Sequence, residues 1–236
     1  MKTKEELLAE NKHDFDSLVS VMAALRGEGG CPWDIEQTHS SVRKCLIEET
    51  YEVVEAIDKD DSVLLREELG DLMFQAVFHA QIEAEEERFD IYDVIHDVTH
   101  KMISRHPHVF AATKVSSSDE VLVNWDNIKK EEKKIVSPAE ALKRVPPYLP
   151  ALLRAQKIQG KARTKYGYGI SDEVSATESL RAAFGDGSNL SESDIVDGIW
   201  SLCALCEMRG IDLEAVLSHK TDDFIDHFEK RETVAD

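Results

Sequence analysis

The sequence predicts an all-α protein. Glycine and proline are scarce, at 11 and 6 of 236 residues, and runs of β-branched residues are few. Apolar residues recur instead at helical spacing through most of the chain. A chain of this length can bury a sizeable core, in one large domain or in two small ones. We therefore expect helical bundles.

The chain is strongly acidic. It carries 28 Lys and Arg against 47 Asp and Glu, a formal charge of −19. This charge argues against a surface for nucleic acid or for an anionic membrane. It does not exclude nucleotides, because bound divalent cations reverse the local field at a carboxylate cluster. The charged start of the chain and the lack of a run of about 18 apolar residues lead us to expect a cytoplasmic protein.

The first half of the chain predicts five helices. Apolar residues at i, i+3 and i+4 define the first, which glycines and a proline over residues 27–34 bring to an end. The turn Asp60-Asp61-Ser62 and the residue Asp90 are expected to cap the third and fourth helices. The third is apolar on nearly all sides, as expected at the centre of a bundle. The five helices are expected over residues 4–26, 40–59, 62–87, 91–105 and 120–135.

A proline-rich stretch over residues 137–150 is the best domain boundary in the chain. We expect one domain over residues 1–136 and a second over 137–236. Four more helices are expected in the second domain, over residues 151–165, 173–184, 192–208 and 212–230. Cys203 and Cys206 have the CxxC spacing, but they lie in an apolar helical run and are interpreted as two small core residues.

Two acidic motifs lie on the second and third helices, Glu48-Glu49-Thr50-Tyr51-Glu52 and Glu67-Glu68-Leu69-Gly70-Asp71. On a helical projection the apolar stripe of each helix lies within about 60° of Glu49 or Glu68. Burying an unpaired carboxylate costs several kcal/mol. These side chains must therefore share protons, pair with cations or hold a metal.

Each motif supplies an i, i+3 pair, Glu49 with Glu52 and Glu68 with Asp71. Two antiparallel helices joined by a short loop would bring these four carboxylates together. Hard oxygen donors suit Mg²⁺ or Mn²⁺ better than zinc, and Mg²⁺ usually completes its shell with water and substrate phosphates. The pattern favours a centre for phosphate chemistry.

The second half contains an echo of the second acidic motif. The stretch from Asp194 to Arg209, with Asp197 three residues on, repeats the acidic pair and the apolar rhythm that begin at Glu68. No Glu-Glu-x-x-Glu motif precedes this second copy. The second half is interpreted as a decayed repeat of the first.

The ordered motifs resemble those of the MazG-type nucleoside triphosphate pyrophosphohydrolases, of the all-α NTP pyrophosphatase superfamily. The resemblance covers about residues 14–160. It rests on the runs Gly30-Cys31-Pro32-Trp33-Asp34 with Gln37-Thr38, Glu48-Glu49-Thr50-Tyr51-Glu52-Val53, Glu68-Leu69-Gly70-Asp71-Leu72, Arg105-His106-Pro107-His108-Val109-Phe110, then Trp125, Lys129 and Leu152-Arg154-Ala155-Gln156-Lys157-Ile158.

This resemblance implies tandem helical bundles, the first complete and the second degenerate, that dimerise through helices. It implies Mg²⁺-dependent cleavage of an NTP or dNTP to NMP and pyrophosphate, a house-cleaning activity on nucleotide pools, with Mn²⁺ as a substitute metal. The implied metal ligands are Glu49, Glu52, Glu68 and Asp71. Since the second copy keeps only Asp194 and Asp197, catalysis is expected to rest on the first repeat.

Further residues are candidates at this site. Glu48, at its edge, is expected either to orient the attacking water or to be a plain surface residue. Lys101 and Arg105, one turn apart, are candidates to bind phosphates or to pair with surface acids. Trp33 and Trp125 are candidates to stack on a base or to pack in the core, and Lys129 is a weaker phosphate candidate.

Two other functions are compatible with parts of the sequence. His96-Asp97 is an HD dipeptide, but there is no clear upstream histidine and downstream aspartate in the order that an HD-type phosphohydrolase needs. A non-catalytic module for nucleotide sensing or dimerisation is the serious alternative, since the second repeat is damaged. The complete first motif favours the enzyme. The base preference and the choice between dimer and tetramer stay open.

Overall fold

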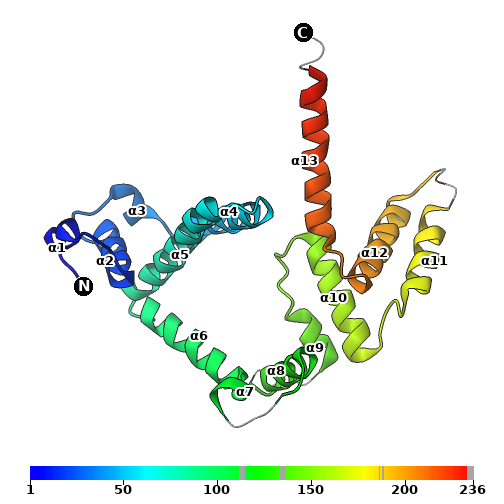
Figure 1. Cartoon of the computed structure of the whole chain (residues 1–236), viewed down its shortest axis with the longest axis horizontal. Coiled ribbons are helices and arrows are strands. Elements are labelled where there is room, and N and C mark those ends of the chain that lie inside the picture. Colours follow the sequence, from blue (N-terminus) through cyan, green and yellow to red (C-terminus); the bar gives the residue numbers. More distant parts are fainter. Residues whose placement is uncertain (112–114, 133–136, 186, 188, 233–236) are drawn as a thin grey trace. The chain divides into compact units, whose positions relative to one another are not determined.

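The computed structural model describes residues 1–111, 115–132, 137–185, 187 and 189–232. These residues form 13 helices and no strand (Figure 1), which confirms the all-α prediction. The chain divides into two compact units, Met1–Trp125 and Asp126–Asp236. The predicted end of the first domain, residue 136, lies outside the described residues, and the division into a catalytic and a degenerate domain stays a prediction.

The first unit contains seven complete helices, and an eighth passes through its end. They are α1 (Lys4–Ala9), α2 (Phe15–Arg26), α3 (Pro32–Glu36), α4 (His39–Asp58), α5 (Ser62–Glu85), α6 (Ile91–Arg105), α7 (Pro107–Phe110) and α8 (Ser118–Glu132).

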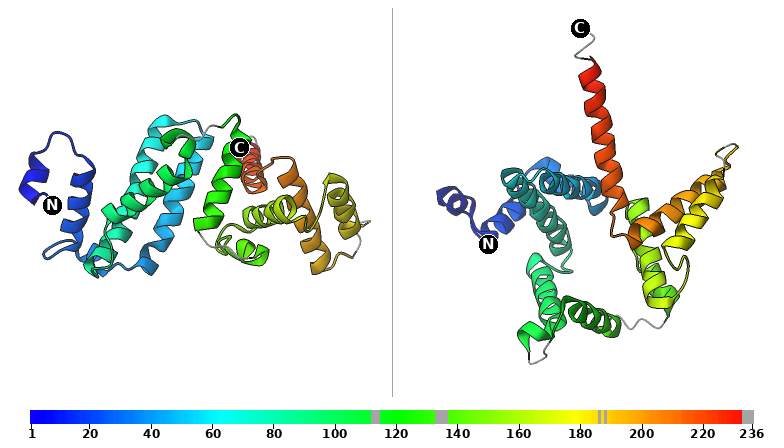
Figure 2. Two further views of the ribbon diagram at one scale, coloured as in Figure 1. Left: turned by 90° about the horizontal axis from the view of Figure 1, so that it is seen from below. Right: turned by 45° about the vertical axis from the view of Figure 1, so that its right-hand side comes forward.

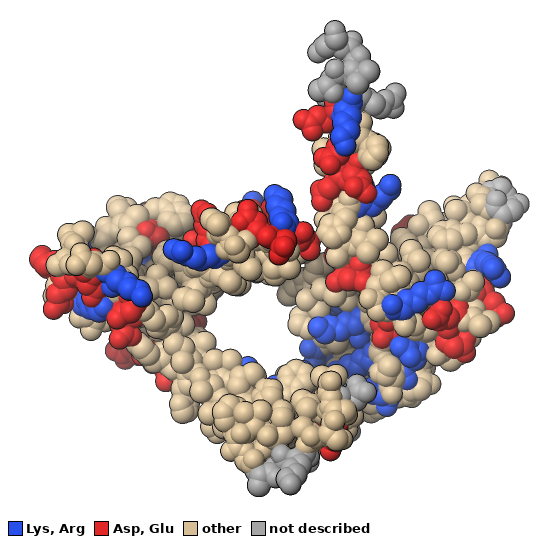
Figure 3. Space-filling view, viewed as in Figure 1, with Lys and Arg blue, Asp and Glu red and all other residues tan. Residues whose placement is uncertain are grey.

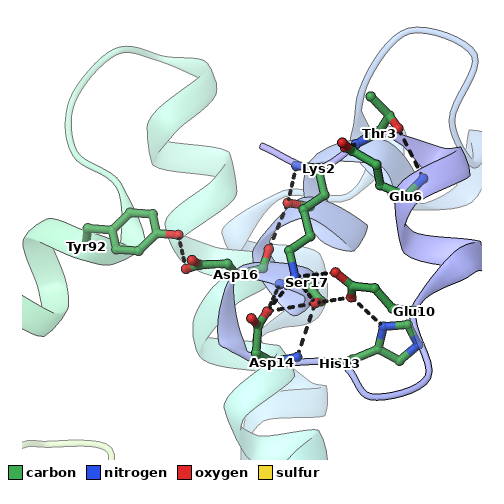
Figure 4. Close-up of polar contacts among 10 residues, drawn as sticks. Lys2, Thr3, Glu6, Glu10, His13, Asp14, Asp16, Ser17 and Tyr92 are labelled. Carbon is green, nitrogen blue, oxygen red and sulfur yellow. Dashed lines mark hydrogen bonds and ion pairs between the residues drawn. The ribbon is translucent and has the colours of Figure 1, made fainter.

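The single helix expected over residues 4–26 is wrong, because a polar network breaks it into α1 and α2. The Asp14 side chain caps α2 by accepting a hydrogen bond from the backbone N–H of Ser17, at 2.9 Å. Lys2 Nζ reaches back to Glu10 at 2.6 Å and to Asp14 at 2.8 Å (Figure 4). The Lys2 hydrogen bond holds the pKa of Asp14 well below its usual range. These contacts supply acceptors for N–H groups in the first turn of α2, which have no intrahelical partner once the helix is interrupted.

Helices α4 and α5 form an antiparallel hairpin and lie side by side (Figure 1). Thr38 caps α4 through a capping box with Ser41. Asp60 turns the chain with a left-handed φ of 51°, and the Asp61 side chain then accepts from the N–H groups of Val63 and Leu64. The turn and cap that the sequence predicts at residues 60–62 are confirmed.

The core of the first unit forms where α2, α5 and α6 meet the start of α4. Its buried members are Val19, Met22, Val42, Val77, Phe78, Ala80 and Ile91. The Arg26 guanidinium lies 5.2 Å from the Phe78 ring centre and binds Glu85 at 2.7 Å. Helix α5 packs against α4, α2 and α6, the central position that its apolar sequence predicts.

The second unit contains the remainder of α8 and five further helices, α9 (Pro138–Lys143), α10 (Ala151–Tyr166), α11 (Glu173–Phe184), α12 (Glu192–Met208) and α13 (Leu213–Glu232). Helices α11 and α12 lie side by side in both views of Figure 2. At their contact a Cβ on Gly198 would lie 2.4 Å from the Phe184 ring, so only glycine allows this approach. Cys203 and Cys206 are buried on α12, which confirms their interpretation as core residues.

Short helices account for most differences from the prediction. The sequence indicates breaks at residues 27–34 and 137–150, yet α3 and α9 form there, each with a proline in its first turn. A proline at this position leaves the helix intact, because the first N–H groups have no intrahelical acceptor. Acidic side chains line much of α13 (Figure 3). No helix within the described ranges is long and apolar enough to cross a membrane.

Candidate functional site

The α4–α5 hairpin brings the predicted carboxylates together. One carboxylate oxygen from each of Glu49, Glu68 and Asp71 can be chosen so that all three lie within 4.8 Å of one another. Glu49 and Glu68 are half-buried, and Asp71 is exposed. Glu52 lies close enough to Glu49 to raise the pKa of the Glu49 carboxyl group. We call these four residues the carboxylate quartet.

Like charges at short range make the quartet electrostatically unfavourable without a cation. Burial raises the pKa of Glu49, and the neighbouring carboxylates raise it further, Glu52 foremost and then Asp71 and Glu68. The pKa of Glu68 is also raised, first by burial and then by the charges of neighbouring carboxylates, Glu52 foremost. Both shifts have the sign expected of carboxylates that a cation would stabilise.

Within the described residues, none of the four carboxylates of the quartet forms an ion pair with a Lys, Arg or His side chain. The nearby Glu48 shows the contrast, because it lies 2.8 Å from Lys44 in an exposed i, i+4 ion pair. A set of clustered, partly buried oxygen donors without an ion pair fits a hard divalent cation such as Mg²⁺ or Mn²⁺. The donor set therefore agrees with the metal that the sequence predicts.

The other candidate residues lie in varied surroundings. Arg105 is buried, with its guanidinium carbon 5.8 Å from the ring centre of Trp125. Lys101 is exposed one turn earlier on α6, and Lys129 is half-buried on α8. Trp33 is exposed on α3, and its carbonyl accepts from Gln37 Nε2 at 2.8 Å. Their contact with a substrate stays a prediction.

The acidic pair of the second unit lies in a different setting. Asp194 is in the first turn of α12, where its Oδ2 accepts from the Ser191 backbone N–H at 2.9 Å and from Ser191 Oγ at 2.7 Å. These hydrogen bonds lower the pKa of Asp194. Asp197 lies one turn later, with its Oδ2 3.5 Å from Ser193 Oγ. The carboxylate of Asp194 is thus used in capping a helix.

A second polar group on the same hairpin is not marked by any motif. His39 Nδ1 and His79 Nδ1 lie 2.7 Å apart, and His39 Nε2 lies 2.6 Å from Glu83 Oε1. A signal was present in the sequence, since His79 and Glu83 are spaced i, i+4 and therefore share a face of α5. Only the pairing of the helices reveals that His39 meets them.

Comparison with known proteins places this hairpin in a recognised domain. A model of the MazG nucleotide pyrophosphohydrolase domain matches residues 37–110, which include the whole quartet. The nucleoside triphosphate pyrophosphohydrolase of Escherichia coli K12 is 49% identical over 148 residues, which cover 62% of this chain and 56% of that protein. The uncharacterized protein YabN of Bacillus subtilis is 48% identical over 156 residues, 66% of this chain and 31% of that protein.

The chain thus spans between about a third and just over half of the length of these two relatives. A third relative matches almost from end to end. The Thermotoga maritima protein named nucleoside triphosphate pyrophosphohydrolase/pyrophosphatase MazG is 36% identical over 223 residues, which cover 92% of this chain and 85% of that protein. The chain therefore belongs to the MazG nucleotide pyrophosphohydrolase family.

Proposed function

We propose that this protein is a Mg²⁺-dependent pyrophosphohydrolase that converts an NTP or dNTP to NMP and pyrophosphate. One observation carries the proposal: Glu49, Glu68 and Asp71 offer oxygens within 4.8 Å of one another, and none of the three forms an ion pair within the described part of the chain. Family membership and the names of the Escherichia coli and Thermotoga maritima relatives support the same activity.

Each residue of the quartet has a stated role in this proposal. Glu49, Glu52, Glu68 and Asp71 would hold Mg²⁺, with Mn²⁺ as a substitute. The bound ion would neutralise negative charge on the triphosphate and on the leaving pyrophosphate. Water attacks one of the two phosphorus atoms that share the α–β bridging oxygen. The bond from that phosphorus to the bridging oxygen breaks, and the products are NMP and pyrophosphate.

Residues around the quartet would bind and orient the substrate. Glu48 would accept a proton from the attacking water or orient it, once its ion pair with Lys44 opens. Lys101, Arg105 and Lys129 would contact phosphates, for which a guanidinium offers bidentate hydrogen bonds.

The aromatic side chains Trp33 and Trp125 would stack on the base. The second unit would act as a degenerate repeat that takes part in dimerisation, and the functional form would be a homodimer.

Product analysis tests the proposal directly. The full chain is incubated with Mg²⁺ and a panel of NTPs and dNTPs, including modified bases, and the products are separated by anion exchange. We expect equal amounts of NMP and pyrophosphate, with EDTA abolishing both. Release of NDP and phosphate would contradict the proposed reaction, and no turnover of any nucleotide would favour a non-catalytic nucleotide-sensing or dimerisation module.

A further inference from the structure

Beyond the quartet, the α4–α5 hairpin is joined at its open end by a polar network that no metal or substrate role explains. His39 is the first residue of α4, and it meets His79 and Glu83 on α5. The two imidazole rings are nearly parallel, with centres 5.0 Å apart and an angle of 2° between their planes, so that they meet edge to edge through the Nδ1 atoms. Arg88 donates to Glu83 from Nε at 2.5 Å and from a terminal nitrogen at 3.1 Å. We call His39, His79 and Glu83 the histidine clasp.

The clasp and the quartet lie on the same seam between the two helices. At about 100° per residue, His79 and Glu68 project within about 20° of each other around α5. On α4, His39 precedes Glu49 by ten residues, or about 15 Å along the helix axis. The loop at residues 59–61 closes the hairpin on the other side of the quartet. The clasp and this loop therefore join α4 to α5 at opposite ends of the hairpin.

The short contact between the two imidazoles requires an unprotonated nitrogen. A hydrogen bond between two Nδ1 atoms at 2.7 Å needs one donor and one acceptor, so at most one of these atoms carries a proton. If His39 and His79 were both charged, each Nδ1 would carry a proton and the contact would become repulsive. The clasp is closed only while the pair carries at most one positive charge.

The surroundings of His79 oppose a second proton. Burial lowers the pKa of His79, and the charge of His39 lowers it further. His79 Nε2 is buried and has no hydrogen-bond partner among the described residues. A second charge on the pair would therefore repel His39 and would leave a buried N–H without an acceptor. Below about pH 6.5, the ordinary imidazole pKa, proton uptake favours the open hairpin end, so stability falls as the pH falls.

Several other charged groups lie around the clasp. Arg43 lies one turn after His39 on α4. Arg26 of α2 forms an ion pair with Glu85 of α5. Asp90, at the start of α6, lines the same pocket as Glu85. The pKa of Glu83 is lowered, first by its hydrogen bond from Arg88, so this carboxylate stays charged while the imidazoles titrate. Histidine is the side-chain type among these groups whose ordinary pKa lies closest to neutral pH, so acidification acts on this end of the hairpin first at its imidazoles.

We propose that the histidine clasp positions α4 against α5 and thereby holds the spacing of the carboxylate quartet, and that it opens when both imidazoles are protonated. His39 and His79 are positioning residues in this proposal and do not touch the substrate. The predicted effect of the clasp on metal binding by the quartet rests on the proposed metal-dependent function. The predicted opening of the hairpin end at low pH is independent of that function.

Mn²⁺ binding to the full chain at pH 8 and pH 6 tests the consequence at the quartet. His79→Leu removes the hydrogen bond at every pH, and we expect Mn²⁺ affinity at pH 8 to fall about 10-fold, the low end for residues that orient metal ligands. His79→Gln retains an amide that can hydrogen-bond His39 but cannot be charged. We expect it to bind as wild type at pH 8 and to lose less affinity than wild type at pH 6.

His227→Gln, which removes an exposed histidine in the second unit, is the matched control and should follow wild type at both pH values. Acidification also protonates the quartet, but that loss is common to all four proteins. The proposal is overturned if all four show the same pH dependence, or if His79→Leu binds Mn²⁺ as wild type does.

A metal-free experiment tests the clasp independently of activity. Imidazole signals of His39 and His79 are followed by NMR from pH 8 to pH 5, with amide hydrogen exchange of the first two turns of α4. We expect coupled titration of the two rings and loss of amide protection in wild type, and retained protection in His79→Gln. Full protection while both rings become charged would overturn the proposal. If the clasp behaves as expected but no NTP is hydrolysed, the proposed function fails and the clasp stands.

Discussion

Glu49 lies at the point of greatest electrostatic conflict on the α4–α5 hairpin. Its pKa is raised by burial and by three neighbouring carboxylates, so the folded state disfavours its charged form. A metal-binding site commonly lowers the stability of the metal-free protein in this way, because residues that suit the ion repel one another without it. The same side chain should therefore have opposite effects on stability and on metal binding.

Replacing Glu49 with Gln should stabilise the metal-free protein at pH 8. A raised folded-state pKa contributes stability at low pH, and that contribution is lost as the pH rises through the folded pKa. In EDTA at pH 8 we expect Glu49→Gln to raise the midpoint of thermal unfolding by about 2 °C, and at pH 4 the difference should vanish. A lower midpoint than wild type at pH 8 would show that Glu49 is already stabilised by another group.

At the residue scale, the sequence was informative where a charge interrupts an apolar stripe. Glu49 and Glu68 stand out for that reason, and the structure brings them together. His39 gave no such signal, because a polar residue after a capping Thr38 is ordinary at a helix start. Its contacts depend on the pairing of α4 with α5, which no local pattern specifies.

The α4–α5 hairpin is the element that builds the site. Its geometry depends on the turn, where Asp60 is left-handed and the Asp61 carboxylate accepts from the first N–H groups of α5. The sequence predicts this turn because consecutive acidic residues and a serine separate two apolar patterns. The break between α1 and α2 escaped prediction, because the helical pattern continues across it and the interruption depends on side-chain bonds from Lys2.

Removing the Asp61 cap should weaken the hairpin. Asp61→Ala leaves two N–H groups of α5 without their acceptor, and we expect the free energy of unfolding to fall by about 1 kcal/mol in urea denaturation. Asp60→Gly is the matched control in the same turn, since it relieves a left-handed residue and should not lower stability. Equal losses in both variants would mean that the acidic charge of the turn matters and the cap does not.

At the scale of the whole molecule, the two units contribute unequally to the proposed activity. In the first unit the quartet lies along the middle of a long hairpin. In the second unit Asp194 caps the start of α12, and its carboxylate accepts hydrogen bonds from Ser191. This difference supports the proposal that the second acidic pair no longer binds metal.

Neutralising both acids of the second unit should therefore leave turnover nearly intact. We expect the double variant Asp194→Asn, Asp197→Asn to release pyrophosphate within about twofold of the wild-type rate. A change of this size corresponds to far less activation free energy than the roughly 1.4 kcal/mol of a tenfold change. Circular dichroism controls for folding of the second unit. A large loss of turnover in a folded variant would assign metal binding or catalysis to the second repeat.

The proposed homodimer has a candidate surface on α6. Its exposed apolar residues recur at i, i+1, i+4 and i+8, which places them within about 100° of one another around the helix, and single chains rarely leave such a stripe uncovered. They are Val94, Ile95, Val98 and Met102. We expect wild type to sediment as a dimer or a larger oligomer and Val98→Glu to sediment as a smaller species, whereas the exposed Val174→Glu in the second unit has no effect. A monomeric wild type at the same concentration would contradict this prediction.

The central claim is that the quartet of the first unit carries out NTP hydrolysis. Pyrophosphate release with Mg²⁺ by wild type, Glu49→Gln and Asp71→Asn, each checked for folding, tests it most directly. Removing one metal ligand should reduce release at least about 10-fold and raise the Mg²⁺ concentration needed for half-maximal rate. The claim is contradicted if either folded variant releases pyrophosphate at the wild-type rate and with the wild-type Mg²⁺ dependence. It is also contradicted if the wild type releases no more pyrophosphate than the variants.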